Sequence, residues 1–320
     1  MRIGYHASHE QFAPSELLAC VKLAQRAGFA AAKSSDHFHP WGEEQGQSGF
    51  AWSWLGAALE ATSFPIGVIS APGWRYHPAI LAQAAATLAE MYPGRFWLAL
   101  GSGQALNEAI TGMAWPPKPE RNARLLECAE VIRALLNGER VTRRGQVHTV
   151  EAQLYTRPAT PPPLYGAAVT PETAELVGGW SDGLLTVGAD PKRVRGVADA
   201  FRRGGGGGKR LLVQVAVSWA ESEAEALEQA HAQWRYNVLG GDVNWTLRTP
   251  AEFDTATRLV RPEDMRASVL VSADLERHAA WIAEYREIGC DEIYLHNVGT
   301  NQRAFIEAFG ERVLPQALAA

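Results

Sequence analysis

The chain has 320 residues, of which 47% are hydrophobic, and its 30 basic and 35 acidic residues give a net charge of −5. It has no excess of positive charge that would attract nucleic-acid phosphates or anionic lipids, so we expect no nucleic-acid partner. It also lacks the roughly 20 consecutive apolar residues that a membrane span needs, so we expect no membrane partner. The sequence begins with a strand pattern instead of a signal peptide, which predicts a cytoplasmic protein.

Short runs of strand-forming residues alternate with amphipathic helical patterns along the whole chain. The eight runs are Ile3–His6, Ala31–Asp36, Ile66–Ala71, Phe96–Gly101, Leu164–Ala168, Gly183–Gly188, Leu211–Val217 and Ile293–Asn297. This alternation predicts parallel βαβ units that close into a (β/α)₈ TIM barrel, and we expect residues 1–320 to form one such domain with inserted segments. Chemistry in these barrels takes place at the carboxyl ends of the strands, so the residues after each run are the candidates for a site.

The helical patterns between the first strands have recognisable boundaries. We expect helices at Pro14–Ala27, Trp52–Ala61, Pro78–Met91 and Glu120–Leu136. The segment before the second of them, Trp41–Ser53, is rich in Gly, Gln and Glu and predicts a loop over the barrel mouth.

Three later segments depart from the alternation. Gly145–Tyr155 has a hairpin-like pattern, and Asn237–Ser268 is an insertion of the size that often forms a lid or an oligomer surface. The glycines Gly204–Gly208 predict a flexible turn, because the Lys209 and Arg210 that follow do not complete a phosphate-binding loop. The cysteines Cys20, Cys128 and Cys290 are widely spaced in apolar patterns, so we assign them to the core.

The second strand ends in the consecutive residues Asp36 and His37, followed by His39 and Trp41. Adjacent residues at a strand end point to different sides, so one can face a pocket while the other anchors the loop, and a histidine suits acid or base chemistry. The alternative is a capping aspartate beside a solvated histidine. His37 and His39 have no evident third ligand, so we predict no metal site.

The fourth strand leads through two glycines into the motif GSGQALNEAITG. Gly103 would let a flat ligand approach the backbone, and the amides of Gln104 and Asn107 would read the edge of a heterocycle. The spacing does not match the dinucleotide fingerprint. An ordinary turn between a strand and a helix is the alternative.

The fifth strand ends in AAVTPET, in which Thr170 has the position of a helix N-cap and Pro171 that of the first helical residue. Free amides and the positive end of the helix dipole make this place suitable for a phosphate, although every capped helix shares these features. Tryptophans are also concentrated at the same end of the barrel, which favours a planar ligand. They are Trp41, Trp52, Trp54 and Trp74.

Taken together, GYHASHEQF, SDHFHPW, WRYHPAILAQAAATLAEMYPGR, GSGQALNEAITG and YLHNVGTNQRAFIEAF resemble the luciferase-like superfamily of flavin and deazaflavin oxidoreductases. The branch they resemble is that of the coenzyme F420-dependent glucose-6-phosphate dehydrogenases. The chain is also similar to a subgroup of that branch regarded as flavin oxidoreductases that do not use F420. The resemblance covers the whole length with its motifs in order.

The resemblance implies a ring of FMN or F420 in the barrel mouth. It implies Asp36 and His37 against the ring, Ile69 and Ser70 near the ring face at a strained bulge that ends the third strand, and Gly103, Gln104 and Asn107 at its side. It further implies the cofactor phosphate on Ala167, Ala168, Thr170 and Thr173. In the dehydrogenases, the residue matching His37 is the base and the residue matching Trp41 supports the intermediate. The residues matching Glu10 and Gln104 are assisting acids. The resemblance also implies a homodimer, because the relatives associate in this way.

The sequence departs from the dehydrogenase pattern where the sugar phosphate would bind. Gln104 replaces a glutamate, so this position has no acid, and His6 replaces a lysine. The lysine expected after the sixth strand is absent from TVGADP, where only Thr186 is retained, and Arg266 is the one cation left to hold a phosphate.

We therefore expect an oxidoreductase that transfers hydride between FMN or F420 and an unidentified organic substrate other than glucose 6-phosphate. The alternatives are a flavin-binding protein without catalytic activity, which the Gln104 change suggests, and a metal-dependent hydrolase that uses Asp36, His37 and His39.

Overall fold

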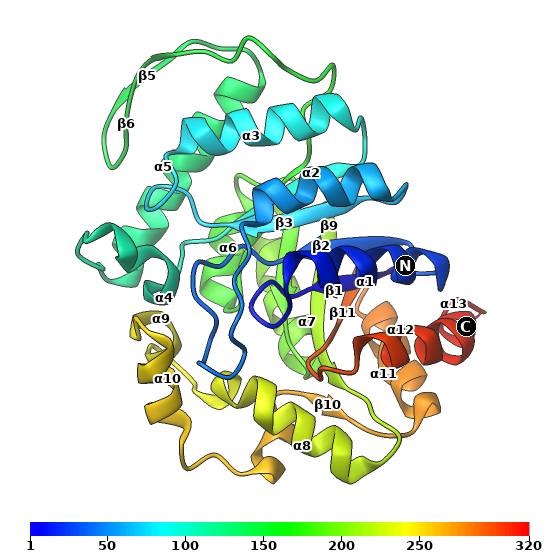
Figure 1. Cartoon of the computed structure of the whole chain (residues 1–320). Helices are drawn as coiled ribbons and strands as arrows, with labels where there is room; N and C mark the ends of the chain where they lie inside the picture. Colours follow the sequence, from blue (N-terminus) through cyan, green and yellow to red (C-terminus); the bar gives the residue numbers. More distant parts are fainter. Residues whose placement is uncertain (320) are drawn as a thin grey trace.

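The computed structural model, which describes residues 1–319, is a closed barrel of eight parallel strands (Figure 1). The barrel strands are β1 (Arg2–Ala7), β2 (Ala31–Ser34), β3 (Ile66–Ser70), β4 (Phe96–Leu100), β7 (Leu164–Ala167), β8 (Gly183–Val187), β9 (Arg210–Ser218) and β11 (Glu292–Asn297). Each pairs with its neighbour in this order, and β11 pairs with both β9 and β1, which closes the ring. The predicted (β/α)₈ barrel is confirmed, and each predicted run coincides with a strand to within a few residues.

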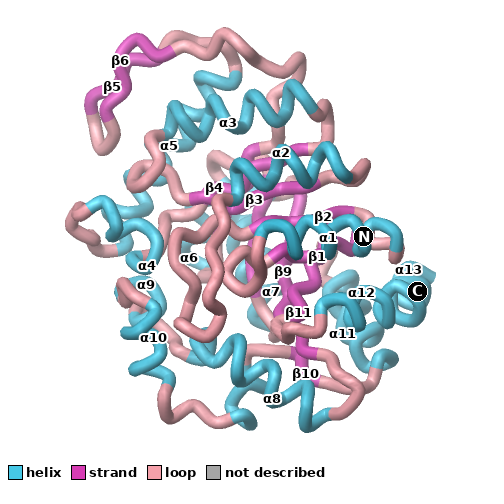
Figure 2. Tube along the Cα trace, in the orientation of Figure 1, coloured by secondary structure: helices cyan, strands magenta, loops and turns pink. Residues whose placement is uncertain are grey.

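Helices surround the barrel, as the tube in Figure 2 shows. The main ones are α1 (Pro14–Arg26), α2 (Ala51–Ala61), α3 (Pro78–Met91), α5 (Lys118–Leu136), α6 (Pro171–Gly178), α7 (Pro191–Phe201), α8 (Glu223–Trp234) and α11 (Leu275–Glu287). In α1, the buried residues Leu17, Val21 and Ala24 recur at the helical period, which turns one apolar stripe toward the strands. The strands are covered on both faces, and every residue of β4 is buried.

The remaining elements are short and lie in the connections. They are α4 (Ala105–Glu108), η1 (Ala109–Thr111), β5 (Val141–Arg144), β6 (His148–Ala152), η2 (Arg202–Gly206), η3 (Arg235–Val238), α9 (Val243–Thr246), α10 (Pro250–Thr257), η4 (Pro262–Ala267), β10 (Leu270–Val271), α12 (Gln302–Ala308), η5 (Phe309–Val313) and α13 (Leu314–Ala319). The hairpin expected at Gly145–Tyr155 begins earlier, at Val141, where β5 starts to pair with β6. Its turn is held by Glu127 of α5, which accepts the amides of Gln146 and Val147 at 2.9 and 3.2 Å.

The insertion between α8 and β10 lies over the barrel mouth. In Figure 1, α4, α9 and α10 lie at the side of the molecule opposite the two termini. Phe253 and Met265 of the insertion are fully buried in a second apolar cluster that includes Trp41 and Leu106, from the connections after β2 and β4. This shared cluster fixes the insertion, which we call the lid, to the rim of the barrel.

The first part of the glycine run packs closely against α6. It continues α7 as the π-helical turn η2, and a Cβ on Gly204 would lie 1.9 Å from the carbonyl oxygen of Glu175 in α6. Only glycine allows this approach between α6 and η2. The predicted position of the turn is correct, and close packing between two helices explains Gly204, whereas a Cβ on Gly207 or Gly208 would meet nothing within 4 Å.

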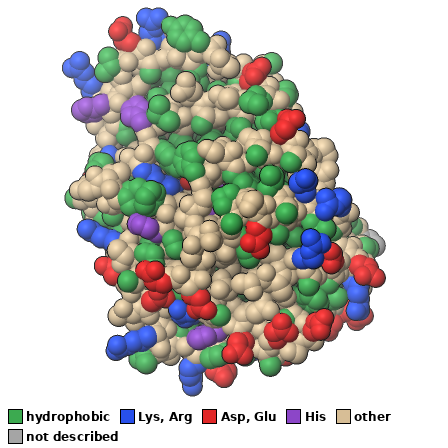
Figure 3. All heavy atoms as spheres, in the orientation of Figure 1, with side chains coloured by type: hydrophobic (Ala, Val, Ile, Leu, Met, Phe, Trp, Pro, Cys, Tyr) green, Lys and Arg blue, Asp and Glu red, His purple; other side chains and the backbone are tan. Residues whose placement is uncertain are grey.

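The outer surface carries both signs of charge. On the face drawn in Figure 3, basic and acidic side chains are interspersed without a broad basic area. Within residues 1–319, no helix is both long and apolar enough to cross a membrane.

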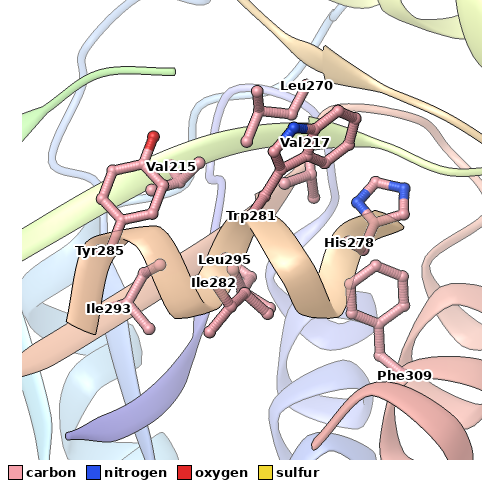
Figure 4. Close-up of a pocket in the computed structure, with 10 residues that line it drawn as sticks. All are labelled: Val215, Val217, Leu270, His278, Trp281, Ile282, Tyr285, Ile293, Leu295 and Phe309. Atoms are coloured by element: carbon pink, nitrogen blue, oxygen red, sulfur yellow. The ribbon is translucent and has the colours of Figure 1, made fainter. Parts of the chain in front are cut away.

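A cavity of about 10 Å³ lies between α11 and the barrel, lined by side chains that include His278, Trp281 and Phe309 (Figure 4). This is the space of about one water molecule. His278 is buried there, its Nε2 lies 3.0 Å from the carbonyl oxygen of Ser272, and burial lowers its pKa to about 4. We interpret this cavity as a packing defect outside the barrel, because its other lining is apolar.

Candidate active site

The upper layer of the barrel interior divides into an apolar and a polar half. Ile69 packs against the cluster of side chains inside the barrel. Side chains two residues apart on a strand point to the same face. Ala167 therefore faces the interior like Tyr165, and Val187 faces it like Leu185. Val187 is 46% exposed although its strand is otherwise buried, which shows that the barrel is open above it. A Cβ on Gly101 would lie 3.7 Å from the Ala167 Cβ and 4.0 Å from the Ile69 Cδ1. This half is a flat apolar floor, and such a floor fits a planar ring.

The polar half consists of His6, Lys33, Gln214 and His296, one from each of β1, β2, β9 and β11. The Lys33 Nζ donates to the Gln214 Oε1 at 2.6 Å and lies 3.4 Å from the His6 Nδ1. The His296 Nδ1 lies 3.5 Å from the Gln214 Nε2, and its ring lies edge-on to that of His6. Burial, followed by the nearby Lys33 and His296, lowers the pKa of His6 well below its ordinary value.

His37 faces a buried carboxylate, Glu10, in the loop after β1. The His37 Nδ1 lies 3.3 Å from the Glu10 Oε1 and 3.3 Å from the carbonyl oxygen of His39. Because both partners are acceptors, the Nδ1 carries the proton and the Nε2 is left as the basic nitrogen. Burial lowers the pKa of His37 below its ordinary 6.5 although the Glu10 carboxylate opposes this, so the ring is neutral at pH 7.

Glu10 itself is ionised. Burial alone would raise its pKa, but His37 and the hydroxyl groups of Ser35 and Ser8 stabilise the carboxylate and bring the pKa to about 2. The Ser35 and Ser8 Oγ atoms donate to the Glu10 Oε2 at 2.6 and 2.9 Å. The predicted acid therefore serves as a fixed negative charge that orients His37 in the manner of a catalytic triad.

Asp36 anchors the loop, and His37 faces the site. The sequence predicted that one of these two residues would anchor the loop and the other would face a pocket. The Asp36 carboxylate accepts hydrogen bonds from Tyr76 at 3.0 Å and from Ser70, and the Arg75 guanidinium lies 3.2 Å away. The Arg75 Nε also lies 3.2 Å from the Glu108 carboxylate. Burial raises the pKa of Glu108 to about 7, although Arg75 acts in the opposite direction. Ser70, predicted at the ring face, thus has its hydroxyl directed to Asp36.

Trp41 forms an aromatic wall beside His37. The two ring centroids are 5.2 Å apart, and Trp41 packs edge-on against Phe253 at 5.4 Å and Trp234 at 6.4 Å. Trp234 in turn lies edge-on to His296 at 4.5 Å. The lid and the polar half of the floor therefore meet at Trp41.

The motif after β4 positions the loop after β2. The Asn107 Oδ1 accepts the amides of Phe38 and His39 at 2.9 and 3.3 Å, while its Nδ2 donates to the Gln104 Oε1 at 3.4 Å. Gly103 has φ +81, and a Cβ there would lie 3.0 Å from Glu108 and 3.1 Å from Trp115. Gln104 is only partly buried and remains available to a ligand.

The helix α6 begins as predicted at the place where we expect the cofactor phosphate to bind. The Thr170 Oγ1 accepts the Thr173 amide at 3.4 Å, and Pro171 begins α6. The amide of Ala168 donates to the Leu185 carbonyl at 3.1 Å, so it is not free for a phosphate, and a ligand here would depend on Thr170, Thr173 and the helix end.

Two further expectations are corrected. β3 pairs with β4 residue for residue from Ile66 to Ser70, so no bulge interrupts it at Ile69. Arg266 is not a free cation, because its guanidinium donates to Glu223 at 3.0 Å and to the carbonyl oxygen of Val271 at 3.2 Å.

The sequence interpretation missed Lys33, Arg75 and Glu108. A lysine within the small and apolar run AAAKSS was the available signal for Lys33, since an inward-facing lysine in a barrel strand is rare. Arg75 and Glu108 carried no such signal, because their roles depend on a contact between the connections after β3 and β4. Within residues 1–319, no group of three or more His, Cys, Asp or Glu side chains has the arrangement of a metal site.

The protein matches known oxidoreductases along its whole length. The family model described as luciferase-like monooxygenase matches residues 1–292. The F420-dependent glucose-6-phosphate dehydrogenases of Beutenbergia cavernae and Mycolicibacterium smegmatis are 36% and 32% identical over 327 and 329 residues, covering 99% of this chain and 97% and 98% of theirs.

Solved structures give the same result. An F420-dependent secondary alcohol dehydrogenase in complex with an F420–acetone adduct has a TM-score of 0.93 at 32% identity, covering 99% of this chain and 98% of its own. A riboflavin lyase with modified FMN, 14% identical with a TM-score of 0.74 over 98% of this chain and 90% of its own, shares the fold.

A (β/α)₈ barrel with a histidine and a carboxylate at its mouth, together with these matches, defines a class of cofactor-dependent oxidoreductases. Within that class, the chain belongs to the luciferase-like family. The predictions of the family, of an oxidoreductase and of FMN or F420 as the cofactor are confirmed at the level of the family.

The stability of the protein should depend on pH through Lys33. Burial lowers its pKa from 10.5 to about 7, so the unfolded chain binds more protons between these values and the free energy of unfolding rises with pH across that interval. Lys33→Met should therefore stabilise the protein by on the order of 2 kcal/mol at pH 6, and the gain should shrink toward pH 10. Denaturant unfolding at both pH values measures this.

The exposed Lys22 of α1 provides the matched control. Lys22→Met should change the free energy of unfolding by little at either pH. A gain from Lys33→Met of the same size at pH 6 and pH 10 would contradict a buried, titrating amine.

Proposed function

We propose that the protein is an F420-dependent oxidoreductase that oxidises an alcohol bound in the barrel mouth, with FMN as the alternative cofactor. Relatives that are at least 32% identical and whose names give a cofactor are F420-dependent. The flat apolar floor of Ile69, Gly101, Ala167 and Val187 supports a ring at this place. The proposal depends above all on one observation, the 3.3 Å contact between the His37 Nδ1 and the buried Glu10 carboxylate.

His37 acts as the base. The Nε2 of a neutral ring whose Nδ1 proton faces Glu10 takes the hydroxyl proton of the alcohol, and the Glu10 carboxylate stabilises the imidazolium that forms. When bound, F420 would accept the hydride from the carbinol carbon, which leaves a carbonyl product. Trp41 walls the substrate on the side of the lid, and Gln104 donates or accepts a hydrogen bond without changing its protonation state.

The structure favours a substrate other than a sugar phosphate. Arg266 is paired with Glu223, and Gln104 has no acidic proton. The Arg266 position therefore offers no free cation for the phosphate of glucose 6-phosphate, and an alcohol without a phosphate at that position fits the site better. The alternative of a flavin-binding protein without catalysis is not favoured, because a histidine base with an orienting carboxylate is retained.

A titration followed by His37→Ala tests this function. We expect the purified protein to bind F420 and to reduce it when a secondary alcohol is added, which the loss of the deazaflavin absorbance reports. His37→Ala should lower turnover at least 10³-fold while the F420 dissociation constant stays within about tenfold. Retained turnover would exclude His37 as the base, and binding of FMN in place of F420 would assign the alternative cofactor.

The pH profile should report the Glu10–His37 pair. Because the Glu10 charge raises the pKa of His37, Glu10→Gln should lower that pKa further below 6.5 and move the acid limb of log kcat/KM to lower pH. The plateau should fall by about 10 to 100-fold, because His37 loses the negative charge that orients its ring and stabilises the imidazolium. Glu16→Gln, an exposed change on α1, is the control, and an acid limb that stays in place in Glu10→Gln would refute the coupling.

We further propose that the protein works in the cytoplasm as a homodimer. Ile80 and Met91 of α3 are 56% and 54% exposed, which supports an apolar surface on this side of the barrel. Sedimentation at micromolar concentration should give twice the chain mass, whereas a monomer would contradict this.

A further inference from the structure

Two cations at the rim of the barrel form no ion pair with any residue of the described chain, residues 1–319. Lys118 is the first residue of α5 and Arg121 lies one turn further on. The Lys118 Nζ donates to the Ser102 Oγ at 2.7 Å, and an Nη of Arg121 donates to the carbonyl oxygen of Gly103 at 3.3 Å. Both therefore contact the segment that directly follows β4.

Neither cation has a carboxylate in salt-bridge contact within residues 1–319. Glu120 in the same helical turn pairs with Arg124 at 3.9 Å instead. Arg121 is 3% exposed, and its buried Nε has no hydrogen-bond partner in the described part of the chain. Burial and then the neighbouring Arg121 lower the pKa of Lys118 to about 8.

The position makes this arrangement unfavourable without an anion. The first turn of a helix carries the positive end of its dipole, so acidic residues are favoured there and two basic ones repel both the dipole and each other. A buried guanidinium nitrogen that lacks an acceptor adds a further cost. An anion placed between the two side chains would offset their mutual repulsion and their repulsion by the helix dipole.

Aromatic side chains enclose the place. The Arg121 guanidinium stacks 4.9 Å from the centroid of Trp115, and Lys118 lies 6.0 Å from the ring of Trp245 in α9. Because α9 packs against α4, the lid covers this part of the rim. Low local polarity strengthens the attraction between the cations and an anion.

We propose that Lys118 and Arg121, at the start of α5, form an anion subsite that binds a carboxylate or phosphate group of a ligand lying in the barrel mouth. The subsite adjoins the floor, because Gly101 is the residue before Ser102. One molecule can therefore lie on the floor and place an acidic group on the subsite. This inference rests on the proposed function for the identity of the ligand but not for the binding of anions.

Two ligands have the required chemistry. F420 carries carboxylates beyond its phosphate, whereas FMN ends in one phosphate, so a second anion subsite would favour F420. The other source is an acidic group on the substrate. The experiments below use F420, the deazaflavin riboside that lacks the phosphate and the acidic tail, and inorganic phosphate as probes.

Fluorescence titration of Lys118→Gln tests the subsite. If it holds the cofactor tail, the dissociation constant of F420 should rise at least tenfold and that of the riboside should not change. Lys118→Arg should restore F420 binding, because it restores the charge. Lys22→Gln, the same change on the exposed side of α1, should bind both ligands as the native protein does.

A substrate group gives a different result. In that case F420 affinity stays constant in Lys118→Gln, while the affinity of the F420-loaded protein for inorganic phosphate, measured by calorimetry, falls at least tenfold. Equal affinities of native protein and Lys118→Gln for F420 and for phosphate would overturn the subsite. If the native protein binds no F420, the proposed function fails, and phosphate binding to the protein without cofactor still decides the subsite by the same comparison.

Discussion

The ionised Glu10 carboxylate, buried at the mouth of the barrel, is the charge on which the arrangement of the site depends. Taking a carboxylate out of water costs several kcal/mol unless donors surround it. Ser8 and Ser35 provide two hydroxyl donors and His37 a third group, which together hold the pKa of Glu10 at about 2. In return, Glu10 fixes the ring of His37 and decides which of its nitrogens is basic. The loop after β1 and the loop after β2 are thus joined by one charge.

A second buried charge group supports the first. Arg75, in the connection after β3, contacts both Asp36 and Glu108, so three successive βα connections share one guanidinium. Removing Arg75 would leave the buried carboxylates of Asp36 and Glu108 without their cation, which is far more costly than the net worth of either ion pair. These contacts hold the connections after β2, β3 and β4 together, and the proton transfer proposed for His37 would require such a fixed position.

The strands, the main helices and the family could be predicted from the sequence, because alternation of buried strands with amphipathic helices and ordered motifs are local signals. His37 and Trp41 also follow from their position at a strand end. Lys33 and Arg75 could not be placed in the same way. Period-two alternation tells which residues face inward, but their partners come from strands and connections far apart in the sequence, as with Lys33 and Gln214.

The errors have the same origin. The bulge at Ile69 was carried over from the family, and the regular pairing of β3 with β4 does not retain it. The amide of Ala168 looked free because it stands before a helix start, yet the neighbouring strand β8 accepts it through Leu185. Arg266 lost its predicted role to Glu223, which no spacing rule indicates. In each of these three cases, the local sequence is compatible with both the predicted and the observed arrangement. A hydrogen bond to a residue far away in the sequence decides between them.

The division of the barrel floor into an apolar and a polar half would orient a bound substrate. The apolar half, formed by β3, β4, β7 and β8, fits the face of a ring. The polar half, formed by β9, β11, β1 and β2, lies beside His37, the proposed base. A substrate between the aromatic wall of Trp41 and the floor would then have its reacting carbon above the apolar half and its hydroxyl near His37. Hydride and proton would leave in different directions, each toward the half of the barrel whose polarity suits it. The buried amine of Lys33, with a pKa of about 7, keeps the polar half from adding a permanent positive charge beside the base.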